Sequence, residues 1–81
     1  MKIKILGKGC ARCEMLEKTV REAVSELSVD AEIEHVRDMD KIMEYPILTT
    51  PGLVIDENLV SSGRVPTKAE VTTFITNALA K

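Results

Sequence analysis

The two cysteines of the chain, Cys10 and Cys13, stand three residues apart. They follow a strand-like run at residues 2–6 and a turn that contains Gly7 and Gly9, and a helix-periodic segment begins beside them. A helix N-terminus carries about half a positive charge and has unpaired N–H groups, which lower the pKa of a thiol placed there. Because the thiolate is the form that attacks disulfides and binds metal ions, this arrangement predicts thiol chemistry at a helix start.

The segment after the turn predicts unequal roles for the two thiols. Its apolar positions recur every three or four residues from Ala11 to about Leu27, which indicates a helix with one buried stripe: Cys13, Leu16, Val20, Ala23, Val24 and Leu27. The stripe includes Cys13 and omits Cys10, so we expect Cys10 at the exposed tip. In thiol–disulfide exchange, the Cys10 thiolate would attack a target disulfide and Cys13 would resolve the mixed disulfide. Lys8 and Arg12 would tune the charge beside the thiols.

A metal ion is the alternative occupant of the same site. Two thiolates suit Cu(I) or another thiophilic species such as arsenite, since soft ligands select soft metals. The run from Gly7 to Cys13 is also similar to the G-M-x-C-x-x-C loop of small heavy-metal-binding domains, with Lys8 in place of the methionine. Those domains run β-α-β-β-α-β, however, and a closed zinc site needs four ligands, whereas this chain offers two cysteines and His35.

Length and composition restrict the class of protein. A chain of 81 residues predicts one domain, residues 1–81, and a composition of 44% hydrophobic and 30% charged residues is that of a globular protein. The net charge is −2 and aromatic residues are scarce, so we expect no nucleic-acid partner. No apolar run is long enough for a signal peptide or a membrane span. We therefore expect a cytoplasmic monomer without a membrane partner, in which a lasting structural disulfide is disfavoured.

The remaining patterns predict the other elements. Residues 31–36 are expected to form an edge strand on which His35 faces the core. Two further strands are expected at residues 53–55 and 59–62, and together they should form a hairpin. Asp38 should cap a short helix over residues 39–45, and Thr67 a last helix over residues 68–80. The expected core residues of the two helices are Met39, Ile42, Met43, Val71, Phe74, Ile75, Ala78 and Leu79. The order β-α-β-α-β-β-α predicts a mixed four-stranded sheet in an α/β fold, with helices on both faces.

Three features of this order together resemble the thioredoxin superfamily. They are the C-x-x-C between the first strand and helix, Thr50-Pro51 before the third strand, and the strand–turn–strand that ends at Gly63 before the last helix. The resemblance covers nearly the whole chain. It is strongest to the small, glutaredoxin-sized redox-active disulfide proteins of prokaryotes, in which Gly-x-Gly-Cys-Ala-x-Cys and Thr-x-Pro-Gly/Ala-Leu-x-Ile-Asp are similar runs. It implies a thioredoxin-like thiol–disulfide oxidoreductase that requires no bound cofactor.

The resemblance also assigns roles around the cysteines. It implies that Pro51 is a cis-proline packed against both thiols and that the backbone of Thr50 pairs with an extended substrate strand. The implied partners are disulfide-containing protein substrates and a flavoenzyme of the thioredoxin-reductase type. Gly9 stands where thioredoxin has tryptophan, and Ala11-Arg12 where glutaredoxins have Pro-Tyr. The stretch 62–66 lacks the acids of the glutaredoxin glutathione site, which argues against glutathione as the substrate.

Overall fold

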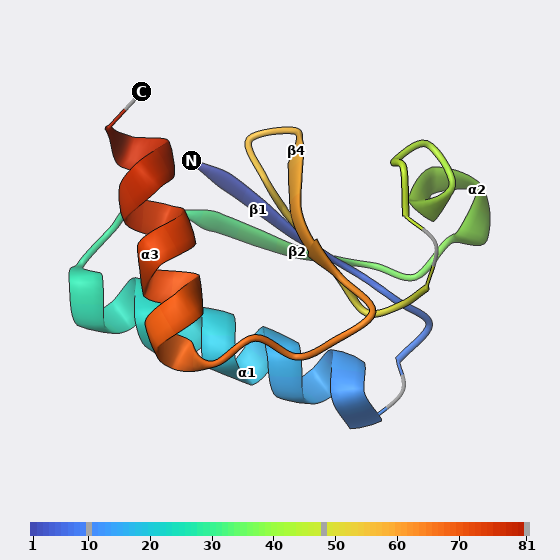
Figure 1. Ribbon diagram of the computed structural model, residues 1–81, viewed down its shortest axis with the longest axis horizontal. Helices are drawn as coiled ribbons and strands as arrows, with labels where there is room; N and C mark the ends of the chain where they lie inside the picture. The colour runs from blue at the N-terminus through green and yellow to red at the C-terminus, as the bar shows by residue number, and fades with distance from the viewer. Residues whose placement is uncertain (10, 48, 81) are drawn as a thin grey trace.

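The computed structural model describes residues 1–9, 11–47 and 49–80. Its elements follow the predicted order: β1 (Lys2–Leu6), α1 (Ala11–Leu27), β2 (Glu32–Val36), α2 (Met39–Ile42), β3 (Gly52–Ile55), β4 (Asn58–Ser62) and α3 (Lys68–Leu79). Figure 1 shows α3 crossing α1 at a steep angle, with the two helices in contact and α2 set apart from them. Among the described residues, no helix is long and apolar enough to cross a membrane.

The sheet has four strands in the order β2-β1-β3-β4. β1 runs parallel to the edge strand β2, and β3 runs antiparallel to both β1 and β4, so the predicted mixed sheet is confirmed. In the centre of the sheet, Ile5 lies between His35 of β2 and Leu53 of β3. One end of the sheet therefore collects the end of β1, the end of β2 and the start of β3.

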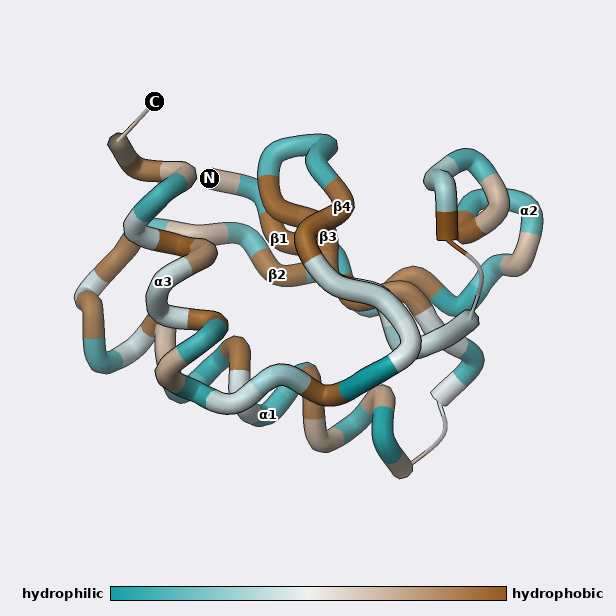
Figure 2. The backbone as a smooth tube through the Cα atoms, viewed as in Figure 1, coloured by the Kyte–Doolittle hydropathy of each residue, from teal (hydrophilic) through white to brown (hydrophobic). Residues whose placement is uncertain are grey.

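Alternation along β1 divides the core between the two faces of the sheet. Ile3 and Ile5 point toward α1 and α3 and belong to the larger cluster: Ile3, Ile5, Leu16, Val20, Ala23, Leu53, Ile55, Val71 and Ile75. Leu6 belongs to a smaller cluster under α2: Leu6, Val36, Ile42, Ile47 and Val54. Figure 2 shows the hydrophobic segments gathered on the strands and the inward side of the helices, while the β3–β4 turn is hydrophilic. Helices thus cover both faces, as predicted.

The two long helices follow their sequence patterns closely. In α1 the stripe residues Cys13, Leu16, Val20 and Ala23 are buried, and Val24 and Leu27 pack partly buried at its edge. Thr67 caps α3 through a capping box, since its hydroxyl accepts from the Glu70 N–H and the Glu70 carboxylate accepts from the Thr67 N–H. The prediction fails at Leu79, which is 53% exposed because it lies in the last turn, at the end of α3.

The second helix is shorter than predicted, and two of its expected core residues are wrong. Asp38 caps it as expected, accepting from the Asp40 N–H, but α2 ends at Ile42. Ile42 is buried, whereas Met39 is 40% exposed and Met43 is 66% exposed. A helix of little more than one turn presents about one position per turn to the sheet, so Ile42 fills that position and the methionines remain outside.

Candidate active site

The turn after β1 brings Gly7 against the sulfur of Cys13. The Gly7 N–H donates to the carbonyl of Val36 at 3.0 Å, which keeps the chain beside β2 after β1 has ended. A Cβ atom at position 7 would collide with Cys13 Sγ and would lie 3.8 Å from Thr50 Cβ. Three segments therefore meet at Gly7: the end of β1, the first turn of α1 and the loop before β3.

Cys13 is fully buried, as its place in the helical stripe predicted. It occupies the first turn of α1, where the unpaired N–H groups of a helix favour a negative charge. Cys10, the predicted nucleophile, lies outside the described residues. Its neighbour Ala11 is the first residue of α1 and is exposed. Within the described residues, the Cys13 thiol lies inside the helix–sheet interface at the start of α1.

The loop before β3 contains a cis peptide bond between Thr50 and Pro51, the isomer that the family resemblance implied. Pro51 is fully buried and Thr50 is half-buried. The carbonyl of Pro51 accepts from the Gly63 N–H at 2.9 Å, so the loop is joined to the turn that follows β4. The structure brings Thr50 to the Gly7–Cys13 contact.

The two cations named from the sequence have different surroundings. Arg12 is exposed, and its Nη2 donates to the Gly63 carbonyl at 2.7 Å, which ties the start of α1 to the turn after β4. Lys8 is exposed at the rim of a groove of about 470 Å³. The groove is lined by Lys8, Met39, Ile42, Met43, Ile47, Thr49 and Thr50. Met39 at the start of α2 and Met43 directly after it therefore line the same groove as Lys8 of the cysteine turn.

Sequence reasoning did not find Arg37, whose guanidinium packs against Gly9. Gly9 has φ +92°, and a Cβ atom there would collide with Arg37 Nη1. This places a cation beside the residue that precedes Cys10. The signal was available in principle: Arg37 directly follows β2, and the ends of two parallel neighbouring strands lie together.

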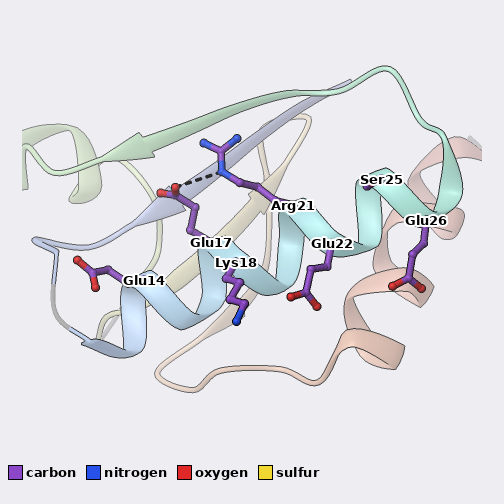
Figure 3. A pocket seen from close by; sticks show the side chains of 7 residues that line it. All are labelled: Glu14, Glu17, Lys18, Arg21, Glu22, Ser25 and Glu26. Carbon is purple, nitrogen blue, oxygen red and sulfur yellow. Dashed lines mark hydrogen bonds and ion pairs between the residues drawn. The ribbon is translucent and has the colours of Figure 1, made fainter.

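His35 and Glu17 form a second group that sequence reasoning left without a function. His35 faces inward as predicted, with 9% of its side chain exposed. Its Nδ1 lies 2.8 Å from Glu17 Oε1 and its Nε2 lies 3.1 Å from the carbonyl oxygen of Gly7. Glu17 also accepts from Arg21 Nε at 3.2 Å, the pair that a dashed line joins in Figure 3. The hydrogen bond with His35, followed by that with Arg21, lowers the pKa of Glu17.

The outer side of α1 carries a shallow hollow with charged walls, which Figure 3 shows from close by. Its lining residues are Glu14, Glu17, Lys18, Arg21, Glu22, Ser25 and Glu26. Within the described part of the chain, no group of three or more His, Cys, Asp or Glu side chains is arranged to hold a metal ion.

Residues 1–76 match the family model described as Thioredoxin domain. The chain belongs to the thioredoxin family. A thioredoxin of Methanothermobacter thermautotrophicus is 52% identical to it over 71 residues, which cover 88% of this chain and 92% of the relative. A thioredoxin of Methanocaldococcus jannaschii is 39% identical over 69 residues, which cover 85% of this chain and 79% of the relative. As a member of the thioredoxin family, the chain is a thiol–disulfide oxidoreductase with protein disulfides as substrates.

Proposed function

We propose that Cys10 and Cys13 are the redox pair of this oxidoreductase. The Cys10 thiolate attacks one sulfur of a protein disulfide, forms a mixed disulfide and releases the first substrate thiolate. The Cys13 thiolate then attacks Cys10 Sγ and releases the second substrate thiolate. Two electrons pass to the substrate, and the two cysteines are left as a disulfide. The observation that carries this proposal is the buried Cys13 in the first turn of α1, packed against Gly7.

The charges around the turn support a reactive thiol. The first turn of α1 offers its N–H groups, and Arg37 at Gly9 and the exposed Lys8 add positive charge on the β1 side. Lowering a thiol pKa from about 8.5 to about 7 corresponds to about 2 kcal/mol and raises the thiolate share at pH 7 from a few per cent to about half. Arg12 is proposed to stabilise the thiolate less than these cations do, because its guanidinium donates to the Gly63 carbonyl.

Thr50 and Pro51 are proposed to receive the substrate. An extended segment of the substrate would pair with the backbone of Thr50, and the groove beside it would take an apolar side chain between Met39 and Met43. The support is the convergence of Thr50 with Gly7 and Cys13 and the exposure of both methionines next to that loop. A complex of Cys13→Ser trapped on a substrate peptide tests this, and a peptide that does not lie along Thr50 would contradict it.

The proposed setting is a reducing one. A monomer of this domain in the cytoplasm would reduce protein disulfides and would be recycled by a flavoenzyme of the thioredoxin-reductase type. The chain contains only the two cysteines of the redox pair, as expected where stable structural disulfides are rare. Sedimentation at increasing protein concentration tests the monomer, and a concentration-dependent dimer would contradict it.

The decisive experiment equilibrates the protein in dithiol redox buffers and traps the free thiols. We expect one reversible two-electron transition that is absent in Cys10→Ser and in Cys13→Ser. Reduction of a protein disulfide should be lost in Cys10→Ser, while Cys13→Ser should accumulate the mixed disulfide with its substrate. If the thiols prove inert toward disulfides and instead bind Cu(I) tightly, the metal-binding alternative replaces the proposed exchange reaction.

A further inference from the structure

A hydrogen-bonded chain joins the outer side of α1 to the cysteine turn. It runs from Arg21 through Glu17 and His35 to the carbonyl of Gly7, with distances of 3.2, 2.8 and 3.1 Å. Glu17 lies one helical turn after Cys13, and His35 belongs to the neighbouring strand, opposite Ile5 in the register of β1 and β2. The imidazole therefore bridges two elements and ends at the residue whose backbone contacts Cys13 Sγ.

The chemistry of the two acceptors assigns the hydrogens of the imidazole. The carbonyl oxygen of Gly7 can only accept, so Nε2 of His35 donates to it. The Glu17 carboxylate, when ionised, also accepts, so a ring hydrogen on Nδ1 would be donated to it. Hydrogen bonds to charged groups are the stronger ones, and with its side chain 9% exposed the imidazole has little water to compete for its N–H groups.

We propose that His35 and Glu17 are positioning residues for the redox pair: Glu17 orients the imidazole, and the imidazole holds the Gly7 carbonyl so that the turn leading to Cys10 stays against Cys13. This inference rests on the proposed role of the two cysteines. Neither residue touches the substrate or exchanges electrons. Their effect reaches the sulfurs through the backbone of Gly7.

The expected consequence concerns the equilibrium between dithiol and disulfide. Closing the disulfide requires both thiols to be held near each other, and an oriented turn raises their effective concentration. If the Gly7 carbonyl is released, the turn gains conformations in which the thiols are apart, and the dithiol form becomes relatively more populated. Loss of one such hydrogen bond should lower the disulfide-to-dithiol ratio in a fixed redox buffer about two- to tenfold.

A matched pair of substitutions at position 35 isolates the hydrogen bond to Gly7. His35→Leu removes the donor, whereas His35→Gln places an amide N–H where Nε2 lies and can still donate to the Gly7 carbonyl. Both variants replace the imidazole with an uncharged side chain, so charge does not distinguish them. We expect His35→Leu to lower the disulfide-to-dithiol ratio by about two- to tenfold, whereas the ratio of His35→Gln should stay within about twofold of that of the original chain. Circular dichroism and unfolding in urea establish that each variant is folded before its ratio is compared.

Glu17 is tested against Glu22, an exposed acid on the same helix. Glu17→Leu should shift the ratio in the same direction as His35→Leu, and it should add nothing in the His35→Leu background, because Glu17 acts through the imidazole. Glu22→Gln should leave the ratio unchanged.

The outcomes separate this inference from the proposed function. If the original chain shows no reversible two-electron transition, the role of the cysteines is wrong. If the transition is present but His35→Leu has the ratio of the original chain, or His35→Gln shifts as far as His35→Leu, positioning through Gly7 is wrong while the exchange reaction stands. Additive effects of Glu17→Leu and His35→Leu would likewise overturn the proposed order of action.

Discussion

A methyl group added at position 7 would test how closely the cysteine turn is packed. In Gly7→Ala, the new Cβ would collide with Cys13 Sγ and would also lie 3.3 Å from Cys13 Cβ. Cys13 is fully buried in the first turn of α1. Its side chain has a single rotatable bond to the sulfur, so the sulfur has less freedom to move aside than the end of a longer side chain.

The size of the effect follows from the cost of overpacking. Inserting a methylene-sized group into a well-packed site costs about 1–3 kcal/mol. In a domain of this size each kcal/mol lowers the melting temperature by about 4–8 °C. Gly52→Ala is a suitable comparison, because its Cβ would meet Cδ1 of Ile47, the far end of a flexible side chain. We expect Gly52→Ala to lower the free energy of unfolding less than Gly7→Ala does.

The assay is urea unfolding under reducing conditions, so that no disulfide contributes to stability. A double-mutant cycle identifies the contact: in the Cys13→Ala background the sulfur is absent, and the penalty of Gly7→Ala should fall by at least about 0.5 kcal/mol. Additive free energies of unfolding for the two substitutions would refute the close contact of Gly7 with the Cys13 sulfur. If Gly7→Ala lowers the free energy of unfolding less than Gly52→Ala does, the Cys13 sulfur is not more restricted than the end of the Ile47 side chain.

Three further predictions concern charge and packing. Arg64 and then the Thr67 N–H lower the pKa of Glu70 from 4.5 to about 2. Between these pH values the unfolded chain binds more protons at Glu70 than the folded chain, so the free energy of unfolding should fall as the pH drops from about 4.5 to about 2. Glu70→Gln should flatten the dependence of the free energy of unfolding on pH in this range, and an unchanged slope would contradict the prediction. Arg37→Gln should slow thiol alkylation at pH 7 by up to about fivefold at low salt and less at high salt, and an equal rate would remove Arg37 from the site. Ile42→Ala should cost about 2–5 kcal/mol in urea unfolding, whereas Met43→Ala should cost less than about 0.5 kcal/mol, and equal costs would be inconsistent with their burial.

Periodicity alone predicted the parts of the site that lie within one element. The helical stripe placed Cys13 inward on α1 because a helix buries one face against a sheet, and the structure has this burial. Outside the site, the alternation of β1 and the capping-box spacing at Thr67 are equally local signals, and both features are present. The family resemblance added what no local pattern contains: the cis isomer of Pro51.

The contacts between elements could not be predicted from these patterns. The bond from His35 to Gly7 depends on the register between β1 and β2, which pairs Ile5 with His35 and which no local spacing specifies. Arg37 is distant from the cysteines in the sequence, so no spacing around them indicates that its guanidinium lies at Gly9. A period of three to four residues does not tell whether a short helix continues for a second turn, which is why the prediction of Met43 as a core residue is wrong.

The register of the sheet is therefore the property on which the site depends most. Leu6 pairs with Val36 in β2 and with Gly52 in β3, so the residues that come next to these at the same end of the sheet are Gly7, Arg37 and Pro51. The parallel β1–β2 pair brings a cation and an imidazole to the cysteine turn, and the antiparallel β3 brings the proline loop. Because side chains alternate along a strand, a slip of one residue between β1 and β2 would turn His35 to the opposite face and separate it from Glu17. Ile33 packs against the cluster under α1 and α3, and Val36 is buried in the cluster under α2. Both would change faces in such a slip, so the apolar alternation along β2 also holds the hydrogen-bonded chain to Gly7 in place.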